Sequence, residues 1–511
     1  MARGVFDLQL RVRHIARNVM SNWLATAANM AVGFFLAPFI VHRLGNVAYG
    51  VWILAISAVN YLSLLDLGMR SSVLRFVSKG RTKGDHHASS EAMSAALWVR
   101  IQISIVVLLI SALLAALFPR MFHIPPELAG DARIAVMIIG FNTALAMSGG
   151  VFGGVLSALN RYDLQSLVTL IQLAIRAIGV VLVLRSGYGI VAIALCELLA
   201  ALVANTLLLL VALRIYPELR VRLTKPDWAV LRQLWSYSFY VFLNTIAIQL
   251  VYQTDNLVVG AMVSAAAVTY YSIGNSLCRY TDQLVGAMTL TFVPAASTYE
   301  AAGDNSKLMG LYRNGTRAMM SVSLPVLVTL MTRGRTFIGL WMGPQYSQTS
   351  GTVLMILATA LFFSLSNNTA AAIAYGVEKH QIVAKWAMIE AIANLTLSII
   401  LARKFGIYGV AIGTLIPSLF VHVCLWPVLF SRLLGLGGPR LVWGVWVPMF
   451  LAAVPFAIAS YALNVLFPPR NLFVFFMQTL ALLPIFFLSV AGVFRVYVRN
   501  QVLPRLRSVF G

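Results

Sequence analysis

Four arginines interrupt long apolar stretches of the chain: Arg100, Arg176, Arg279 and Arg333. A charged group inside a membrane span is costly, so each arginine needs an ion-pair partner, a water-filled cavity or a functional role. A guanidinium group can hold phosphate oxygens through paired hydrogen bonds. These four residues could therefore line a cationic cavity that binds a substrate.

Four acidic residues stand in similar apolar stretches and are candidates for binding a coupling cation: Asp255, Asp282, Glu390 and Glu197. A carboxylate in a span can take up a proton or a metal cation, and burial favours the protonated form. A buried, protonated Glu390 without a coupling role is an equally simple interpretation.

Each of these residues also has a structural interpretation. Arg176 and Glu197 are expected at similar depth in neighbouring spans, where they could form an ion pair. Asp282 follows Arg279 by three residues, so the two share a helical face and Asp282 could neutralise the arginine. Asp255 is a second possible partner of Arg279.

The remaining charged residues have simple structural alternatives as well. Arg100 could extend along its helix to the inner membrane surface, and Arg333 could anchor at the outer interface. Asp66 is expected to cap a helix, or to pair with Arg70 or Arg75, rather than to bind an ion.

The composition places these charges in a membrane protein. Of 511 residues, 60% are hydrophobic and 11% are charged, against about a quarter charged in an ordinary soluble domain. Apolar stretches predict about fourteen transmembrane helices of about 20 residues each, hence an all-α polytopic membrane protein. Cys196, Cys278, Cys424 and the seven scattered histidines lack the spacing of a disulfide framework or metal site. We expect no metal and no cofactor.

The distribution of basic residues predicts the orientation. The chain has 38 Lys and Arg against 16 Asp and Glu, a net charge of +22. With the N-terminus inside, 26 of the 38 fall in cytoplasmic segments and 9 in outer segments, which predicts that both termini are cytoplasmic. Anionic membrane lipids, rather than nucleic acid, are the expected partners of this charge.

A short repeat predicts the domain organisation. Residues 185–193 read RSGYGIVAI and residues 404–412 read KFGIYGVAI, at an offset of 219. Six predicted spans lie within this offset, so the copies share one orientation. We predict two parallel six-helix lobes plus a C-terminal helix pair, the plan of a transporter whose lobes rock about a central site. The expected divisions are a basic cytoplasmic tail (1–17), a first lobe (18–213), a cytoplasmic linker (214–233), a second lobe (234–434), the helix pair (442–498) and a cytoplasmic tail (499–511).

Two observations bear on activity. The linker contains either an interfacial elbow helix or the early start of the seventh span. No segment outside the predicted spans is long enough for a catalytic or nucleotide-binding domain, and the GxxxxGK[ST] loop is absent. An enzyme or an ATP-driven pump is therefore not expected.

Several motifs resemble those of one family. Residues 42–75 contain Leu-Gly, Tyr-Gly and Leu-Asp-Leu-Gly motifs, residues 253–255 read QTD, residues 270–271 are a tyrosine pair, and residues 339–346 read GLWMGPQY. This pattern resembles the polysaccharide-export and O-antigen flippase family of the multidrug, oligosaccharidyl-lipid and polysaccharide exporter superfamily. The family is described as fourteen helices in two six-helix lobes plus two.

The resemblance implies a function. It implies movement of isoprenoid-pyrophosphate-linked oligosaccharide across the bacterial inner membrane by alternating access, coupled to a proton or sodium gradient or uncoupled, beside a polysaccharide polymerase. Arg279 would then contact the pyrophosphate, and Arg100 could receive the head group first. The alternative is a cation-coupled multidrug exporter of the same superfamily. Its cationic substrates would favour acidic linings, whereas the charge in these spans is more basic.

Overall fold

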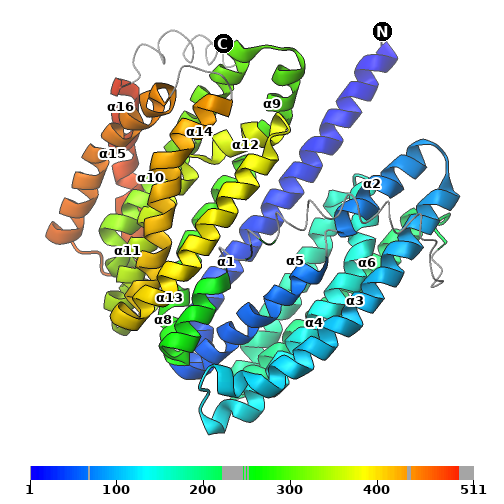
Figure 1. The fold of residues 1–511 in the computed structure, drawn as a ribbon, viewed down its shortest axis with the longest axis horizontal. Helices are drawn as coiled ribbons and strands as arrows, with labels where there is room; N and C mark the ends of the chain where they lie inside the picture. The colour runs from blue at the N-terminus through cyan, green and yellow to red at the C-terminus, as the bar shows by residue number, and fades with distance from the viewer. Residues whose placement is uncertain are drawn as a thin grey trace. The chain divides into compact units, whose positions relative to one another are not determined.

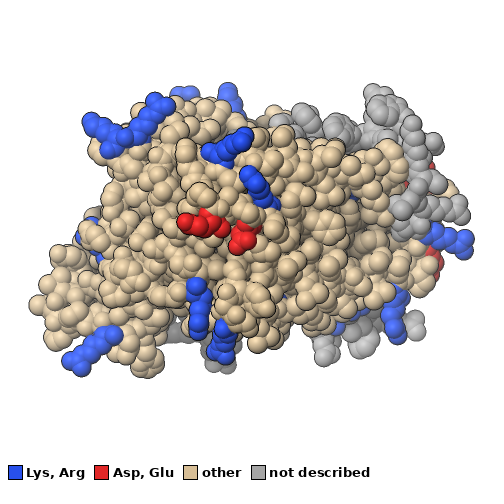
Figure 2. Space-filling model, turned by 90° about the horizontal axis from the view of Figure 1, so that it is seen from below, with Lys and Arg blue, Asp and Glu red and all other residues tan. Residues whose placement is uncertain are grey.

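The computed structural model describes residues 2–66, 69–220, 246, 249, 253–289, 291–433 and 439–493. Within these ranges every regular element is a helix. Most of the face seen in Figure 2 is uncharged, with isolated Lys and Arg side chains on it. Large apolar side chains such as Phe35, Leu109 and Leu488 are exposed, as expected where lipid is the solvent and each helix satisfies its own backbone hydrogen bonds. The predicted all-α polytopic fold is confirmed.

The chain divides by its internal contacts into two compact units, Met1–Thr269 and Tyr270–Gly511. The first unit contains these helices, labelled in Figure 1: α1 (Ala2–Asn60), the short 3-10 helix η1 (Tyr61–Asp66), α2 (Met69–Thr82), α3 (His86–Met121), α4 (Pro126–Ala158), α5 (Tyr162–Arg185) and α6 (Ile190–Ile215). Within this unit, α3 and α6 both pack on α4, and α1 packs on α5.

The second unit contains most of α8 (Ala265–Thr289) and all later elements. These are α9 (Phe292–Ala301), α10 (Asn305–Trp341), α11 (Pro344–Leu365), α12 (Asn368–Gly376), α13 (His380–Leu419), the π-helical turn η2 (Phe420–Leu425), α14 (Trp426–Leu433), α15 (Arg440–Leu466) and α16 (Leu472–Val493). The C-terminal pair α15 and α16 packs on α10.

Nine helical segments of the described chain are long and apolar enough to cross a membrane. Two of them, Met20–Asp66 with 47 residues and Gln381–Arg432 with 52, are about twice the length of one crossing. Divided at their kinks, the nine segments account for eleven of the fourteen predicted spans. The more polar helices α8 and α10 correspond to two others, and the predicted span around Ile248 lies largely outside the described residues.

Glycine permits the two kinks. Gly45 in α1 has φ 79° and ψ 168°, and Gly406 in α13 has φ 57° and ψ −133°. These conformations are essentially restricted to glycine. Gly187, which precedes Gly406 by the repeat offset of 219, also has a positive φ of 83°. The two copies of the repeated segment therefore turn at the same position.

Glycines on α4 let its neighbours approach closely. A Cβ atom at Gly140 would lie 2.2 Å from the Ser111 hydroxyl of α3, and one at Gly149 would lie 1.8 Å from the Asn205 side-chain oxygen of α6. Such distances leave no room for any side chain at either position. The close packing of α3, α4 and α6 frames the polar cavity described below.

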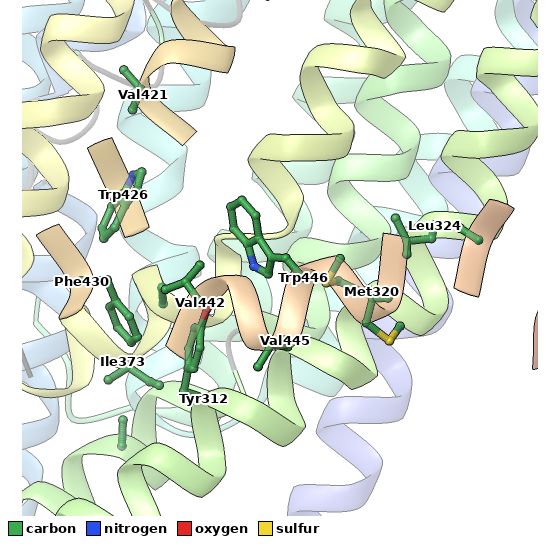
Figure 3. Close-up of a cluster of buried hydrophobic side chains, with 14 of the residues drawn as sticks. Tyr312, Met320, Leu324, Ile373, Val421, Trp426, Phe430, Val442, Val445 and Trp446 are labelled. Atoms are coloured by element: carbon green, nitrogen blue, oxygen red, sulfur yellow. The ribbon is translucent and has the colours of Figure 1, made fainter. Parts of the chain in front are cut away.

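The core of the second unit joins seven of its described elements, which are α9, α10, α12, η2, α14, α15 and α16. Tyr312 of α10, Ile373 of α12, Phe430 of α14 and Trp446 of α15 are buried together (Figure 3). The rings of Tyr312 and Phe430 lie 4.6 Å apart between centroids. This cluster fixes the first helix of the C-terminal pair to the rest of the unit.

The proposed domain boundaries remain predictions. Residues 221–245, which include most of the predicted linker 214–233, lie outside the described residues, as does the predicted tail 499–511. The choice between an elbow helix and an early seventh span falls in that part of the chain. The predicted basic tail 1–17 is continuous with helix α1.

Candidate functional site

A polar cavity of about 540 Å³ lies inside the first unit, between η1 and helices α3 to α6. One charged pair, Arg100 and Asp66, contributes to its wall. The uncharged polar side chains that line it are Asn60, Ser63, Asn142, Thr143, Gln165, Thr169, Gln172 and Asn205. The cavity therefore combines one guanidinium group with many neutral hydrogen-bonding groups.

Arg100 is held firmly in this wall. Its side chain is 2% exposed, and its Nη2 lies 2.5 Å from Oδ1 of Asp66, which is 29% exposed. Its Nη1 donates a hydrogen bond to the carbonyl oxygen of Met147 on α4. A Cβ atom at Gly150 would come within 3.0 Å of that Nη1, so this glycine leaves space for the guanidinium group.

The structure thus gives Arg100 and Asp66 partners that the sequence did not indicate. Arg100 is buried rather than extended to the membrane surface, and its two Nη atoms contact Asp66 and a helix carbonyl inside the unit. The expected partners of Asp66 were Arg70 and Arg75, whose side chains lie outside the described residues.

Arg176 on α5 and Glu197 on α6 lie side by side. Arg176 Nε is 2.6 Å from Glu197 Oε1, with side-chain exposures of 39% and 19%. This is the ion pair expected from their similar depth in neighbouring spans. Gln172, one turn before Arg176, lines the cavity, whereas Arg176 is not among the lining residues.

Arg333 on α10 faces the C-terminal helix pair. Its side chain is buried, at 1% exposure, and it donates hydrogen bonds to the side-chain oxygens of Asn464 on α15 and Gln478 on α16. The guanidinium carbon lies 4.4 Å from the centre of the Phe475 ring. These contacts make Arg333 a link between three helices.

Arg279 and Asp282 both lie on α8 and are partly buried. Among the described residues, the Arg279 side chain makes no hydrogen bond or ion pair, including with Asp282. Asp255 is 5% exposed and lies in a buried polar run with Thr254 and Asn256. Asp255 belongs to the first unit, whereas Arg279 and Asp282 belong to the second.

Glu390 has a partner that was not predicted. His422 Nε2, on the π-helical turn η2, lies 3.3 Å from Glu390 Oε2 on α13. Asn367, between α11 and α12, places its amide nitrogen 3.2 Å from His422 Nδ1 and donates to the His422 carbonyl oxygen at 3.1 Å. Glu390 and His422 stand 32 residues apart, and no local spacing signals their contact.

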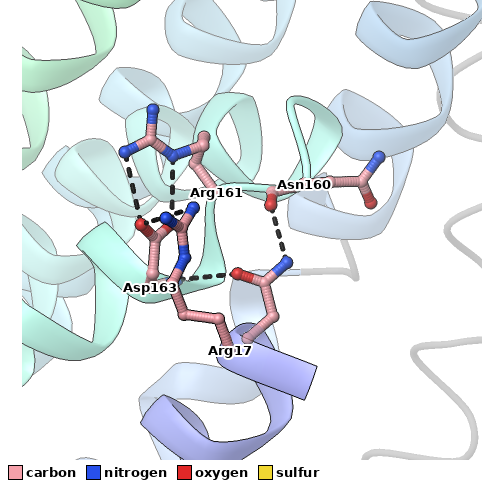
Figure 4. A network of polar contacts seen from close by, with 5 residues as sticks. Arg17, Asn160, Arg161 and Asp163 are labelled. Carbon is pink, nitrogen blue, oxygen red and sulfur yellow. Dashed lines mark hydrogen bonds and ion pairs between the residues drawn. The ribbon is translucent and has the colours of Figure 1, made fainter. Parts of the chain in front are cut away.

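A second polar network joins the beginning of the first span to the turn between α4 and α5 (Figure 4). Asp163 accepts from Arg161 at 3.0 Å and lies 3.2 Å from Arg17. Asn18 donates to the carbonyl oxygen of Asn160 at 2.8 Å and accepts from the backbone of Asp163. This network links α1 to the N-terminal end of α5.

The described residues contain no group of three or more His, Cys, Asp or Glu side chains placed to hold a metal ion. The polysaccharide biosynthesis protein family matches residues 15–300, more than half of the sequence. The chain belongs to this family.

Individual relatives agree with the family assignment. The chain is 24% identical over 424 residues to the "Uncharacterized membrane protein EpsK" of Bacillus subtilis, covering 82% of this chain and 83% of that protein. It is 18% identical over 400 residues to the "Putative O-antigen transporter" of Shigella flexneri, covering 78% of this chain and 94% of that protein.

A solved structure shares the fold. The lipid II flippase MurJ, in an inward closed conformation, superposes with a TM-score of 0.76 at 13% identity, covering 94% of this chain and 99% of that one. MurJ is named as a lipid II flippase, and the Shigella protein is named for O-antigen transport. The family match confirms the predicted resemblance to the polysaccharide-export family, and the MurJ structure shares the predicted all-helical fold. The names of these relatives agree with the prediction of a transport protein rather than an enzyme.

Proposed function

We propose that this family member is a flippase for isoprenoid-pyrophosphate-linked oligosaccharide in the bacterial inner membrane. It would work by alternating access, with both termini in the cytoplasm. The observation that supports this proposal most directly is the cavity of the first unit, where Arg100 stands among neutral hydrogen-bonding side chains. Membership of a polysaccharide biosynthesis family agrees with it.

Arg100 supplies the chemistry that a pyrophosphate needs. Removing a pyrophosphate from water without a cationic partner would be prohibitive, and the planar guanidinium fork matches two phosphate oxygens. Asp66 orients the guanidinium group before substrate binds, and pyrophosphate oxygens then compete with its carboxylate. The neutral lining residues suit the hydroxyl groups of the first sugar.

The volume of the cavity limits which part of the substrate it can hold. At about 540 Å³, it has the volume of a small-molecule pocket, enough for a pyrophosphate and an adjoining sugar. The isoprenoid chain would stay in lipid, which is its natural solvent. Arg279 is a second candidate contact for the pyrophosphate.

The other candidate residues for substrate binding and ion coupling differ in how well their contacts fit those roles. Arg176 and Arg333 are engaged by Glu197 and by the C-terminal helix pair, so a substrate contact would have to displace those partners. Asp255, Asp282, Glu390 and Glu197 remain proposals for coupling to a proton or sodium gradient. Work beside a polysaccharide polymerase is a further proposal.

The multidrug-exporter alternative is less well supported. A site for cationic drugs would need unneutralised carboxylates, whereas the acidic residue that lines the cavity, Asp66, is paired with Arg100. We would measure dye efflux from cells that overexpress the protein to test it. Resistance to cationic dyes would restore this alternative.

The decisive experiment is deletion of the gene in its host, with mass spectrometry of isoprenoid-pyrophosphate-linked glycans. We expect complete units to accumulate and surface glycan to disappear. Complementation with Arg100→Ala should fail, whereas Arg100→Lys should restore part of the export because it keeps the charge without the fork. Unchanged glycans in the deletion strain would refute the proposal.

A further inference from the structure

Glu390, His422 and Asn367 bring three segments of the second unit together. Glu390 lies in the first half of α13, His422 in the π-helical turn η2, and Asn367 in the turn between α11 and α12. Their side chains are largely buried: Asn367 is 4% exposed, and His422 and Glu390 are 12% and 18% exposed. π-helical turns inside α-helices occur frequently at functional sites.

The orientation of the Asn367 amide is fixed by a group that can only accept. The carbonyl oxygen of His422 lies 3.1 Å from the Asn367 Nδ2 atom, so the amide must present its NH₂ group to this side. The same nitrogen lies 3.2 Å from His422 Nδ1. An amide nitrogen only donates, so Nδ1 must be the acceptor and therefore has no proton.

This arrangement determines the tautomer of His422. A neutral imidazole with a bare Nδ1 has its proton on Nε2, and Nε2 lies 3.3 Å from Glu390 Oε2. The ring therefore donates to the carboxylate. A second proton, on Nδ1, would face the NH₂ group of Asn367, so two donors would meet. Rotating the amide to present its oxygen to Nδ1 would place that oxygen against the carbonyl oxygen of His422, so two acceptors would meet.

We infer that these three residues form a proton-binding site, in which the proton enters on the Glu390 carboxylate while the His422 imidazole stays neutral. A hydronium ion of the solvent loses one proton and becomes water, and that proton forms an O–H bond on Glu390 Oε1, while Oε2 continues to accept from His422 Nε2–H. No bond of His422 or Asn367 forms or breaks. The gain is neutralisation of a carboxylate within a span, where an isolated charge is costly.

The charged and titratable groups on the neighbouring elements leave this assignment intact. They are Tyr346 on α11, Tyr375 on α12, His380, Lys385, Arg403, Lys404 and Tyr408 on α13, Cys424 on η2 and Arg432 on α14. Among the described residues, Glu390 and His422 make no hydrogen bond or ion pair with any of these groups.

The donors around Glu390 favour a proton over a sodium ion. Hard metal cations require several oxygen ligands, whereas the group facing the Glu390 carboxylate is the N–H of a ring that Asn367 keeps in one tautomer. The proton is therefore the coupling ion that this site would select. This coupling role rests on the proposed flippase function, whereas the proton site itself does not.

Protonation would also change the strength of the hydrogen bond that joins α13 to η2. A hydrogen bond to a carboxylate is roughly twice as strong as one to a neutral acceptor. Protonation of Glu390 therefore weakens the contact from His422 and loosens η2 from α13. This gives the proton a means of altering the conformation of the second unit.

Infrared titration of the purified full-length protein tests the site without any substrate. The carboxyl band of Glu390 is obtained by subtracting the spectrum of Glu390→Gln, and a control band by subtracting that of Glu300→Gln, an exposed glutamate on α9. We expect His422→Gln to shift the Glu390 band and to leave the Glu300 band unchanged. A Glu390 band that is insensitive to His422→Gln would overturn the proposal.

The role of Asn367 is tested in the same titration with isotope-labelled histidine. Asn367→Asp replaces the donor by an acceptor, so we expect an imidazolium signal from His422 in this variant. Asn367→Leu removes the donor and should give the same signal more weakly, which keeps the test open if one variant does not fold. A His422 imidazolium signal in the wild-type protein would refute the neutral-ring assignment.

Transport in proteoliposomes tests coupling, with farnesyl pyrophosphate as the probe. We expect a pH gradient to accelerate wild-type translocation and a sodium gradient to have no effect. In Glu390→Gln, the stimulation of translocation by the pH gradient should fall by about tenfold or more, the size of a typical coupling between two sites. In Glu300→Gln, this stimulation should be unchanged. Stimulation by sodium alone would overturn the proton assignment. If the wild-type protein neither binds nor moves the probe while the infrared results hold, the flippase proposal fails and the proton site stands.

Discussion

Arg279 offers the clearest test of substrate contact at the scale of a single residue, because its guanidinium group makes no hydrogen bond or ion pair with another described residue. We expect Arg279→Ala to abolish surface glycan in the complemented deletion strain while expression is retained. A charge-assisted hydrogen bond contributes up to about 3 kcal/mol, or roughly a hundredfold in affinity. Arg279→Lys should retain part of the export.

The matched control for this substitution is Arg313→Ala, because Arg313 is an exposed arginine on α10. It should export glycan at the wild-type level. Normal surface glycan from the Arg279→Ala strain would exclude a contact between Arg279 and substrate.

Arg333 leads to the opposite expectation. Because it binds Asn464, Gln478 and the face of Phe475, Arg333→Gln should destabilise the protein by about 1.5 to 3 kcal/mol, the contribution of hydrogen bonds to a charged group. Arg333→Lys should also destabilise it, since lysine lacks the fork. Thermal unfolding in detergent measures both effects.

A double-mutant cycle distinguishes this structural role from substrate binding. The costs of Arg333→Gln and Gln478→Leu should add to more than the cost of the double variant, because both remove one contact. Loss of transport without any change in unfolding temperature would instead place Arg333 in the substrate path.

At the scale of the element, Gly406 controls how α13 turns. Its φ of 57° and ψ of −133° lie in a region essentially restricted to glycine, so Gly406→Ala should cost about 1 to 3 kcal/mol. Nothing lies within 4 Å of a Cβ atom built there, so the cost is one of backbone conformation, not of collision.

Gly310 provides the control for this prediction. It lies within α10, and a Cβ atom there also has nothing within 4 Å. Because alanine favours a helix over glycine by about 0.5 to 1 kcal/mol, Gly310→Ala should keep or raise the unfolding temperature. A Gly406→Ala protein as stable as Gly310→Ala would show that the turn does not require glycine.

Elements were easier to predict than their contacts. Apolar length located the long membrane-spanning helices, whereas the short helices α2, α9 and α12 were not predicted. The repeat predicted two lobes, and the turn that its copies share at Gly187 and Gly406 is a finding of the structure. The ion pair of Arg176 with Glu197 was expected because depth in the membrane follows from position along neighbouring spans. The partners of Arg100, Arg333 and Glu390 were not found, because a helix that is apolar all round gives no stripe from which to infer the direction of a side chain.

At the scale of the whole molecule, the predicted two-lobe plan places different polar residues at corresponding positions. Gln172 lines the cavity of the first unit, and Glu390 stands 218 residues later, within one residue of the repeat offset of 219. A neutral amide in one copy and a carboxylate in the other would suit a division of labour. The first unit would then bind the anionic head group, and the second would bind the proton.

Orientation decides the direction of any transport, and the basic residues predict it. Placing 26 of the 38 Lys and Arg outside the cytoplasm would violate the positive-inside rule. Single cysteines in a variant lacking the three native ones can test this at exposed positions. We expect a membrane-impermeant maleimide to label Ser186→Cys and Arg470→Cys in intact cells, and Lys83→Cys only after the membrane is opened. The reverse pattern would invert the predicted orientation. An even number of predicted spans separates Ser186 from Arg470, which places both positions on the same side of the membrane. Labelling of Ser186→Cys without labelling of Arg470→Cys would therefore contradict the predicted spans.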